Sequence, residues 1–365
     1  MSLYVDIEKR YGTFQLKMKF ESGDEVLSLL GASGCGKSLT LKCIAGIETP
    51  DRGRIVLDGK VLFDSEKRIN LPPQKRKVGY LFQQYALFPN MTVYQNIAAG
   101  IRKKKKNSRN NKNNVEEKCG GYNKETVDHI VGQMLTSMGL EGMEGKYPHQ
   151  LSGGQQQRAA LARILVNEPD ILLLDEPFSA LDSHLRFRLE QQVRDIMHRF
   201  GKSVVLVSHN RDEVFRLTDK IAVIADGMLE TIGDKHQVFR EPQTKNGAVL
   251  TGCKNISPVK WLDDHHVLAL DWNMTLQVDK PLKDVSHIGI RMKYIHAGNE
   301  GENTFRCKVI EVIENPFSYT VMLVNADNPG SIPIGWEMLK DTWESMKTEI
   351  VTISMPSSAI LLLKE

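Results

Sequence analysis

At 365 residues the chain is longer than one average domain, and its hydrophobic (41%) and charged (25%) contents are ordinary for a globular protein. The formal net charge of +3 is too small to indicate a nucleic-acid partner, and we expect none. No apolar run approaches the roughly 18 residues of a membrane-spanning helix, and residues 1–6 lack the pattern of a secretory signal. The five cysteines are widely scattered, which predicts reduced thiols rather than disulfides or a zinc site.

Up to about residue 240, strand-like apolar runs alternate with helical patterns, which predicts an α/β fold. Residues 25–30 are expected to form a buried strand, and residues 38–45 the helix that follows it. Further strands are expected at 78–82, 171–174, 204–208 and 221–224. Their high content of Val, Ile and Leu suits parallel strands that are covered on both faces.

A glycine-rich motif lies between this first strand and its helix. The segment Gly31-Ala-Ser-Gly-Cys-Gly-Lys37-Ser38 fits the pattern GxxxxGK[ST] of phosphate-binding loops. Backbone N–H groups of such a loop curl around phosphates, Lys37 reaches the β- and γ-phosphates of ATP, and the Ser38 hydroxyl ligates Mg²⁺. The residues predicted to contact ATP here are Gly31, Ala32, Ser33, Gly34, Cys35, Gly36, Lys37, Ser38 and Leu39.

The pattern breaks down between residues 101 and 124. A run of positive charges at 102–106 is followed by asparagines and glycines, and such a segment buries too little apolar surface to offset its ordering entropy. We predict a mobile basic insertion, which is either a solvated loop or a contact for anionic lipid headgroups. From Val127 onward, apolar residues at helical spacing predict an amphipathic helix that packs on the core.

The apolar run 171–174 ends in two neighbouring acids, Asp175 and Glu176. A parallel strand delivers such residues to its carboxyl end, where open α/β sheets bind ligands. One carboxylate can hold Mg²⁺ while the next polarises a water molecule for attack on a phosphate. We assign the metal to Asp175 together with Ser38, and the catalytic role to Glu176.

The character of the chain changes after about Pro242. Several short alternating runs separated by Asp, Asn, Gly and Pro predict strands without helices, and hence a small barrel or sandwich. These strands are expected at 266–270, 275–278, 288–294, 305–313, 319–324 and 350–354. We therefore predict an α/β nucleotide-binding domain over 1–240 and a small all-β domain over 241–365, of the OB-like barrel type.

The segment Leu151-Ser152-Gly153-Gly154-Gln155 resembles the signature of ABC-type ATPases, and a helical pattern follows it. Ser152 and the N–H groups of Gly153 and Gly154 would form a second anion cradle at a helix start. The resemblance implies a cassette with a helical subdomain. It also implies that this cradle closes over the γ-phosphate bound by a partner subunit, so that two chains share two sites.

Other motifs follow in the order of that family. Gln83 resembles the glutamine that touches Mg²⁺ and the attacking water, and His209 resembles the switch histidine that contacts the γ-phosphate. Ser179-Ala-Leu-Asp182 resembles the loop that adds Asp182 to the nucleotide site. Asn210 stands where the family commonly has Asp, with no consequence for catalysis that we foresee. Tyr11 resembles the aromatic residue that stacks on adenine, and the alternative is a packed strand residue.

The resemblance extends over nearly the whole chain. Residues 53–60, 71–76 and 85–89 resemble ATPases of bacterial and archaeal importers for oxyanions and sugars, and 61–65 and 251–255 resemble the molybdate or sulfate importer ATPases most. The resemblance implies a homodimer at the cytoplasmic face of the membrane. Transmembrane permease subunits are expected to bind near 83–88 and Val127, and an extracytoplasmic substrate-binding protein is expected to act indirectly.

The β-rich tail is similar to the regulatory domain of these subunits, and a basic-polar cluster at Lys254, Asn255 and Ser257 suggests an oxyanion site there. Three alternatives stay open. The first is a sugar or iron importer ATPase. The second is a soluble ABC ATPase of translation or DNA repair, and the third is an oxyanion sensor without ATPase activity. One cassette and no sustained heptads disfavour the second, and intact Lys37, Asp175, Glu176 and His209 disfavour the third.

Overall fold

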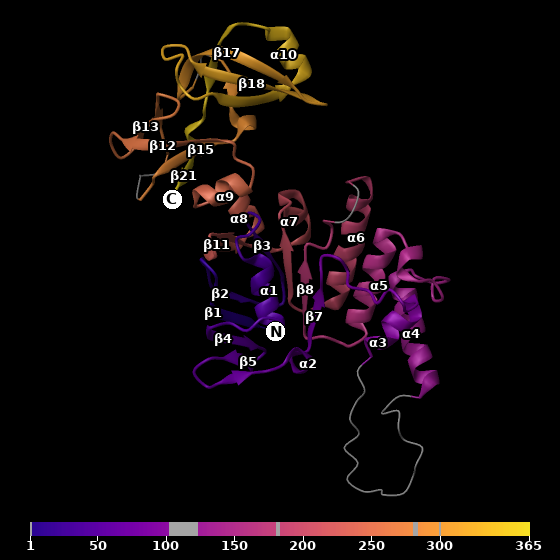
Figure 1. The fold of residues 1–365 in the computed structure, drawn as a ribbon. Helices are drawn as coiled ribbons and strands as arrows, with labels where there is room; N and C mark the ends of the chain where they lie inside the picture. Colours follow the sequence, from indigo (N-terminus) through magenta and orange to yellow (C-terminus); the bar gives the residue numbers. More distant parts are fainter. Residues whose placement is uncertain (1, 102–122, 180–182, 280–283, 299–300) are drawn as a thin grey trace, which may run out of the picture. The chain divides into compact units, whose positions relative to one another are not determined.

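The computed structural model describes residues 2–101, 123–179, 183–279, 284–298 and 301–365. Most of the predicted basic insertion over 101–124, and Asp182, lie outside the described residues. The chain divides into two compact units, Met1–Leu229 and Glu230–Glu365 (Figure 1). This division falls somewhat earlier than the expected boundary at 240/241, and the assignment of a separate task to each part stays a prediction.

The first unit is built on one mixed sheet. Its strands run in the order β6-β5-β4-β1-β2-β11-β10-β3-β9-β8-β7 in the part of the chain that the structure describes. The antiparallel strands are β1 (Leu3–Tyr11), β2 (Phe14–Ser22), β4 (Arg52–Leu57), β5 (Lys60–Asp64) and β6 (Ile69–Asn70). The parallel strands are β3 (Val26–Leu30), β7 (Val78–Leu81), β8 (Ile171–Asp175), β9 (Val204–Ser208) and β10 (Lys220–Ala225), and β11 (Met228–Asp234) pairs in parallel with β2 at Met228.

The parallel strands are aligned at their carboxyl ends. Leu30 of β3 lies beside Ser208 of β9, Asp175 of β8 lies beside Val207 of β9, and Leu81 of β7 lies beside Leu174 of β8. Every residue of β8 and β9 is buried. The prediction of parallel strands covered on both faces is confirmed.

Helices cover both faces of this parallel part. Side chains of β8 and β9 alternate between two apolar clusters, so that Leu172 and Leu174 face one cluster while Ile171 and Leu173 face the other. The helices of the unit are α1 (Lys37–Ala45), α2 (Pro73–Arg76), α3 (Val93–Ala99), α4 (Lys124–Met138), α5 (Gly153–Leu165), α6 (Ser183–Phe200) and α7 (Arg211–Leu217), with a short 3-10 helix at Pro148–Gln150.

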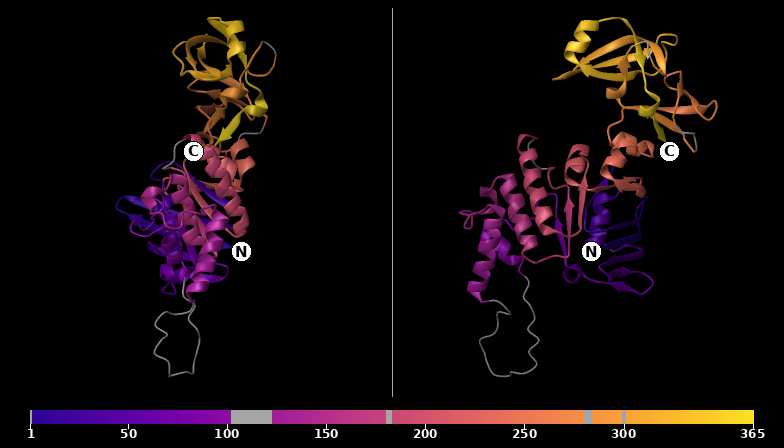
Figure 2. Two further views of the ribbon diagram at one scale, coloured as in Figure 1. Left: turned by 90° about the vertical axis from the view of Figure 1, so that its right-hand side faces the viewer. Right: turned by 180° about the vertical axis from the view of Figure 1, so that it is seen from behind.

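Helices α3, α4 and α5 form a group of their own. They pack on one another, and Figure 2 shows this magenta group at the end of the unit opposite the indigo strands β4 and β5. On α4, the predicted amphipathic helix, Val131, Leu135 and Met138 are buried in the same apolar cluster as β7 and α5. The stripe therefore packs in the core, as predicted.

The second unit is rich in strands, as predicted. One sheet runs β14-β13-β12-β15-β21 and another runs β16-β20-β17-β18-β19 within the described residues, and both contribute to one apolar core. The strands are β12 (Asn255–Trp261), β13 (His266–Ala269), β14 (Met274–Gln277), β15 (His287–Ile290), β16 (His296–Ala297), β17 (Thr304–Glu314), β18 (Ser318–Asn325), β19 (Ile334–Leu339), β20 (Ile350–Ser354) and β21 (Leu361–Leu363).

Short helices accompany these strands. They are α8 (Lys235–Arg240), α9 (Lys245–Leu250) and α10 (Lys340–Met346), with 3-10 helices at Met292–Tyr294 and Ser357–Ala359. Two of them, α9 and α10, lie after Pro242, where the sequence predicted no helix. Helices of six or seven residues complete too few turns to produce a recognisable apolar period. Among the described residues of the chain, no helix is both long and apolar enough to cross a membrane.

The carboxyl end of α1 is held by a fully buried arginine. The Arg76 guanidinium donates to the carbonyl oxygens of Cys43 and Ile44, both at 2.8 Å, and to Leu71 O at 2.7 Å and Asn70 Oδ1 at 2.8 Å. The first two lie in the last turn of α1, and the carbonyl oxygen of Cys43 also accepts from Gly46 N at 3.2 Å. Burial lowers the pKa of Arg76, but a guanidinium stays charged and suits the negative end of the helix dipole.

We expect Arg76→Lys to destabilise the first unit by about 2–4 kcal/mol. A lysine keeps the charge, but its single ammonium cannot reach acceptors on both sides of the arginine fork, so buried carbonyls lose their donors. Calorimetric unfolding without nucleotide measures the loss as a lower transition temperature for this unit. The exposed neighbour Lys75 is the control, because Lys75→Met should change stability by no more than about 0.5 kcal/mol. Equal stability of Arg76→Lys and the unmodified chain would contradict the capping role.

Candidate functional site

The phosphate loop connects β3 to α1, and its backbone leaves no room for side chains at two glycines. A Cβ atom at Gly31 would lie 2.4 Å from the carbonyl oxygen of Ile224, and one at Gly36 would lie 2.5 Å from Leu16 Cδ1. Gly36 also has a φ of 101° and directly precedes the helix. These glycines let the chain turn tightly into α1, whose free N–H groups then point into the loop.

Lys37 is the buried cation of this loop. Its ammonium donates to the carbonyl oxygens of Gly31 (2.8 Å) and Ala32 (2.7 Å), and the residue is only 5% exposed. The loop therefore curls around the lysine while the start of α1 supplies N–H groups and the positive end of its dipole. This combination of N–H groups, helix dipole and cation is suited to a phosphate chain.

A pocket of about 460 Å³ opens beside the loop. Its lining includes Tyr11 and six of the nine loop residues predicted to contact ATP, but not Gly31, Ala32 or Cys35. The lining residues are Tyr11, Phe14, Ser33, Gly34, Gly36, Lys37, Ser38, Leu39, Lys42, Glu48 and Glu176. Tyr11 is 69% exposed, so it is not a packed core residue, and Phe14 lies on the same pocket lining. Sequence reasoning missed Phe14. Its signal in the sequence is that Tyr11 and Phe14 flank the two residues Gly12 and Thr13, and the structure pairs these two aromatics across a tight hairpin.

Asp175 is held by two hydroxyl groups. Ser38 Oγ donates to its Oδ1 at 2.7 Å, and the Tyr80 hydroxyl donates to its Oδ2 at 2.8 Å. Burial, reinforced by the Asp175 carboxylate, raises the pKa of Tyr80, which therefore remains a donor. Sequence reasoning paired Ser38 with Asp175 but missed Tyr80, whose only signal is a polar-tipped aromatic within an apolar strand.

The oxygen atoms of Ser38 and Asp175 fit a magnesium ion. Mg²⁺ prefers hard oxygen ligands and takes only one or two from the protein when a nucleotide supplies the others. The structure places the Ser38 hydroxyl against the Asp175 carboxylate, whereas the amide of Gln83, the third predicted ligand, lies 3.3 Å from Glu176. Among the described residues, no group of three or more His, Cys, Asp and Glu side chains could hold a metal. The ligand set predicted from the sequence is thus chemically suitable.

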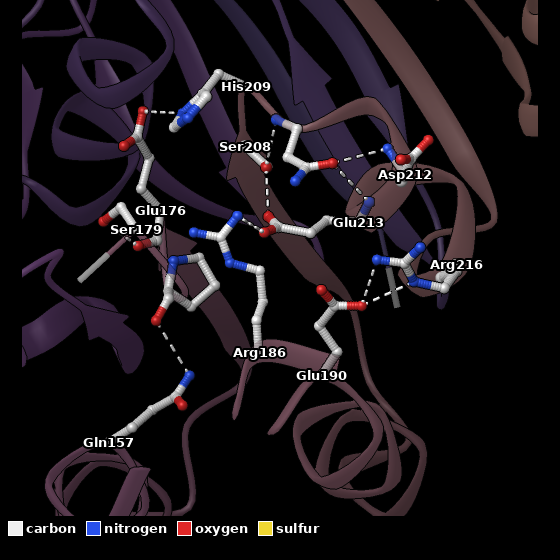
Figure 3. Close-up of polar contacts among 12 residues, drawn as sticks. Gln157, Glu176, Ser179, Arg186, Glu190, Ser208, His209, Asp212, Glu213 and Arg216 are labelled. Carbon is white, nitrogen blue, oxygen red and sulfur yellow. Dashed lines mark hydrogen bonds and ion pairs between the residues drawn. The ribbon is translucent and has the colours of Figure 1, made fainter. Parts of the chain in front are cut away.

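Glu176 lies at the meeting point of two loops. Gln83 Nε2 is 3.3 Å from its Oε2. His209 Nδ1 is 3.3 Å from its Oε1, and Figure 3 shows this contact. The structure thus brings together the three residues that were predicted to be catalytic. They come from the loops after β7, β8 and β9, as the aligned carboxyl ends of these strands require.

The backbone of Glu176 is unusual. Its φ of 46° lies in the left-handed region, which non-glycine residues rarely adopt. The conformation is fixed from both sides, since its N–H donates to Val207 O (3.0 Å) and its carbonyl oxygen accepts from Ser179 N (3.3 Å) and Oγ (3.0 Å). This fixed turn directs the carboxylate toward Gln83 and His209.

The next carbonyl oxygen, that of Pro177, connects this turn to two other segments. It accepts from the buried Tyr85 hydroxyl at 3.3 Å and from Gln157 Nε2 of α5 at 3.2 Å. Gln157 is fully buried and reaches across from the signature helix (Figure 3). The loop after β7, helix α5 and the turn at Glu176 are therefore linked through one backbone atom.

The signature segment begins α5. Ser152 is the N-cap, its Oγ accepts from Gln155 N at 3.4 Å, and Gln155 Oε1 accepts from Ser152 N at 2.9 Å. Gly153 and Gly154 form the first turn, and a Cβ atom at Gly154 would lie 2.6 Å from Leu189 Cδ2. Residues 152–155, which all belong to the described part of the chain, do not line the pocket beside Lys37 of the same chain.

The polar cluster proposed for an oxyanion in the second unit is already engaged. Asn255 donates to Gly335 O (2.7 Å) and accepts from Gly335 N (2.8 Å), which joins β12 to β19. Ser257 Oγ donates to Pro258 O (2.9 Å) and accepts from Asp271 N (3.0 Å). Lys254 alone of the three is exposed. Asn255 and Ser257 therefore serve the unit's own structure, and only the exposed Lys254 of this cluster stays a predicted contact for an oxyanion.

Comparison with known proteins agrees with this geometry. The family model described as ABC transporter matches residues 14–179. The chain is 39% identical over 265 residues to the spermidine/putrescine import ATP-binding protein of Clostridioides difficile, covering 72% of this chain and 70% of that one. It is 38% identical over 256 residues to a sulfate/thiosulfate import ATP-binding protein of Chromobacterium violaceum, covering 69% and 63%.

A solved structure is similar as well. It is the dimeric post-hydrolysis state of the ATP-binding cassette MJ0796 bound to ADP and Pi, with 27% identity and a TM-score of 0.50, covering 64% of this chain and 99% of that one. The fold and the phosphate loop define a P-loop ATPase. The chain belongs to the ABC transporter family, as an ATP-binding subunit of importer type.

We expect Lys37→Ala to weaken ATP binding by roughly 10- to 100-fold, because charge-assisted hydrogen bonds to the phosphates contribute about 1.5–3 kcal/mol. Isothermal titration with Mg²⁺-ATP measures the change. Lys42→Ala removes the same charge from the pocket lining and serves as the control, with an expected change below about threefold. Unchanged affinity of the Lys37→Ala protein would show that the nucleotide does not bind in this loop.

Proposed function

We propose that the chain hydrolyses ATP as one of a pair of identical subunits that power the import of a small solute through membrane permease subunits. The observation that carries this proposal is the convergence of Gln83 and His209 on Glu176, beside the phosphate loop of Lys37. A phosphate cradle, an acid for water activation and two polar residues that contact this acid form the set that phosphoryl transfer to water requires.

The pairing of two subunits is supported by the position of the signature segment. Since residues 152–155 do not line the pocket of their own chain among the described residues, their cradle at the start of α5 is available to a second copy. ATP would then bind between Lys37 of one subunit and Ser152 of the other. The dimeric state of the related cassette with ADP and Pi supports this arrangement. Asp182 is proposed to contribute to the same interface.

In the proposed reaction, the Glu176 carboxylate orients a water molecule in line with the γ-phosphate. The water oxygen bonds to the γ-phosphorus as the bond to the β–γ bridging oxygen breaks, and the proton released by water passes through Glu176 to solvent. Gln83 and His209 hold the carboxylate, while Gln83 contacts the attacking water and His209 contacts the γ-phosphate. Ser38, Asp175 and Gln83 would hold Mg²⁺, which neutralises phosphate charge when bound.

The permease subunits are proposed to contact the loop after β7. Phe82, Phe88 and Met91 are 37%, 46% and 37% exposed there, although large apolar side chains usually avoid water. This surface lies next to Gln83 in the chain, so a movement of the permease would reach Glu176 directly. The subunit would thus lie at the cytoplasmic face of the membrane, with a substrate-binding protein acting only through the permease.

For the solute we propose an oxyanion, with molybdate, tungstate and sulfate as the candidates. The similarity to the sulfate/thiosulfate protein supports this class, together with the likeness of residues 61–65 and 251–255 to such ATPases. A polyamine is the second candidate, because a spermidine/putrescine import protein is equally similar in identity. We keep the binding of an oxyanion to the second unit as a proposal, at a site other than Asn255 and Ser257.

We expect Glu176→Gln to lower kcat for ATP hydrolysis by about 10²- to 10⁴-fold and to leave ATP affinity nearly unchanged, because general-base assistance is lost while the phosphate contacts stay. The substituted protein should accumulate as an ATP-bound dimer. Steady-state phosphate release and size-exclusion chromatography with Mg²⁺-ATP measure the two effects.

The matched control for this experiment is Glu168→Gln, at another glutamate with a left-handed backbone (φ 48°) that lies outside the site. It should hydrolyse ATP at the normal rate. If the Glu176→Gln protein also keeps the normal rate, another group activates the water and the proposed role of Glu176 is wrong.

Uptake measurements distinguish the solutes. In cells that lack this chain, we expect uptake of labelled sulfate or molybdate to fall to background and to be restored by the intact chain but not by Lys37→Ala. Spermidine uptake should be unaffected. Loss of spermidine uptake with normal sulfate and molybdate uptake would replace the oxyanion by a polyamine, while the ATPase proposal would still stand.

A further inference from the structure

A buried carboxylate lies directly behind the histidine of the site. Glu213, in the first turn of α7, is only 4% exposed. Its Oε2 accepts a hydrogen bond of 2.7 Å from Ser208 Oγ, and its Oε1 is 3.5 Å from Arg186 Nη1 of α6 (Figure 3). A buried acid normally lowers stability unless it is well paired, and the proposed chemistry gives Glu213 no direct part.

The Ser208 hydroxyl connects Glu213 to the turn that carries His209. While it donates to Glu213, the same oxygen accepts from the N–H of Asn210 at 3.0 Å. The hydroxyl therefore links the backbone N–H just after His209 to the buried carboxylate of Glu213. Asn210 is the N-cap of α7, since its Oδ1 accepts from the N–H groups of Asp212 (2.9 Å) and Glu213 (3.3 Å).

A hydroxyl group has one proton to donate, and the strongest acceptor nearby determines where it points. With Glu213 present, the proton of Ser208 is directed to the carboxylate and a lone pair is left for Asn210 N–H. Without Glu213, the hydroxyl is free to rotate, and the N–H group loses its fixed acceptor. Burial raises the pKa of Glu213, while Ser208 and Arg186 act in the opposite direction and favour the acceptor form.

We infer that Glu213 is a positioning residue for ATP hydrolysis, which acts through Ser208 to hold His209 against Glu176. This inference rests on the proposed role of His209. Glu213 itself touches neither nucleotide nor water, so its effect should fall on the catalytic step rather than on ATP binding. Displacement of a catalytic group by about 1 Å can lower a rate by up to roughly 100-fold.

A second buried acid on the same helices provides a matched control. Glu190 of α6 is 2% exposed and is paired with Arg216 of α7 at 2.7 and 2.8 Å (Figure 3). None of its described hydrogen bonds or ion pairs reaches Ser208, His209 or Asn210. Loss of Glu190 should therefore disturb the packing of α6 on α7 as much as loss of Glu213, without moving the histidine.

The test measures kcat and KM for ATP in the full chain. We expect Glu213→Ala to lower kcat by about tenfold or more with KM within about twofold, and Glu213→Gln to recover most of the rate because its amide oxygen still accepts from Ser208. Glu190→Ala should keep kcat within about twofold despite a similar drop in unfolding temperature. In a His209→Ala background, Glu213→Ala should cause no further loss, because the two residues act in series.

Ser208→Ala keeps the inference testable if Glu213→Ala does not fold. It should lower kcat by a similar factor, with ATP affinity unchanged, and the loss should again vanish in the His209→Ala background. A normal kcat in both variants, or an undiminished further loss in the His209→Ala background, would overturn the inference alone. A normal kcat in the single variant His209→Ala would instead remove the proposed role of His209, and the inference with it.

Discussion

The parallel register of β3, β9, β8 and β7 is the constraint on which the site depends. Because Leu30, Ser208, Asp175 and Leu81 end their strands at one edge, the phosphate loop, the histidine turn, the acidic pair and the glutamine loop leave the sheet side by side. A slip of one residue would turn the side chains of a strand to the opposite face. Since both faces of β8 and β9 are buried in separate apolar clusters, burial itself enforces the register that the chemistry needs.

Much of this arrangement could be predicted, because the informative signals are local. The phosphate loop and the acidic pair are short motifs next to apolar strands, and the order of the remaining motifs supplied Gln83 and His209. The contacts that could not be predicted join residues far apart in sequence. Tyr80 lies 95 positions from Asp175, and Gln157 and Tyr85 meet at Pro177 only through packing. The engagement of Asn255 with Gly335, 80 positions away, depends on tertiary contacts in the same way.

The polar contacts behind the site form one connected framework rather than isolated bonds. Tyr80 orients Asp175, Pro177 receives Tyr85 and Gln157, and Glu213 orients Ser208. Each involves a buried group that would lower stability if its partner were absent. Helix α5 belongs to this framework through Gln157, so its position is linked to the turn that carries Glu176. A displacement of α5 by a neighbouring subunit is therefore mechanically connected to Glu176, the acid proposed to activate water.

The left-handed backbone of Glu176 sets stability against activity at a single position. A side chain in this conformation costs about 1 kcal/mol relative to glycine, whose backbone adopts it freely. Selection for a more stable fold alone would thus drift toward glycine or asparagine at position 176 and lose the carboxylate. A stabilisation strategy that ranks substitutions by folding energy alone would therefore replace Glu176 and remove its carboxylate. The exposed Glu168 shares this backbone conformation, so what distinguishes Glu176 is the combination of a left-handed backbone with a place at the carboxyl end of β8, against Gln83 and His209.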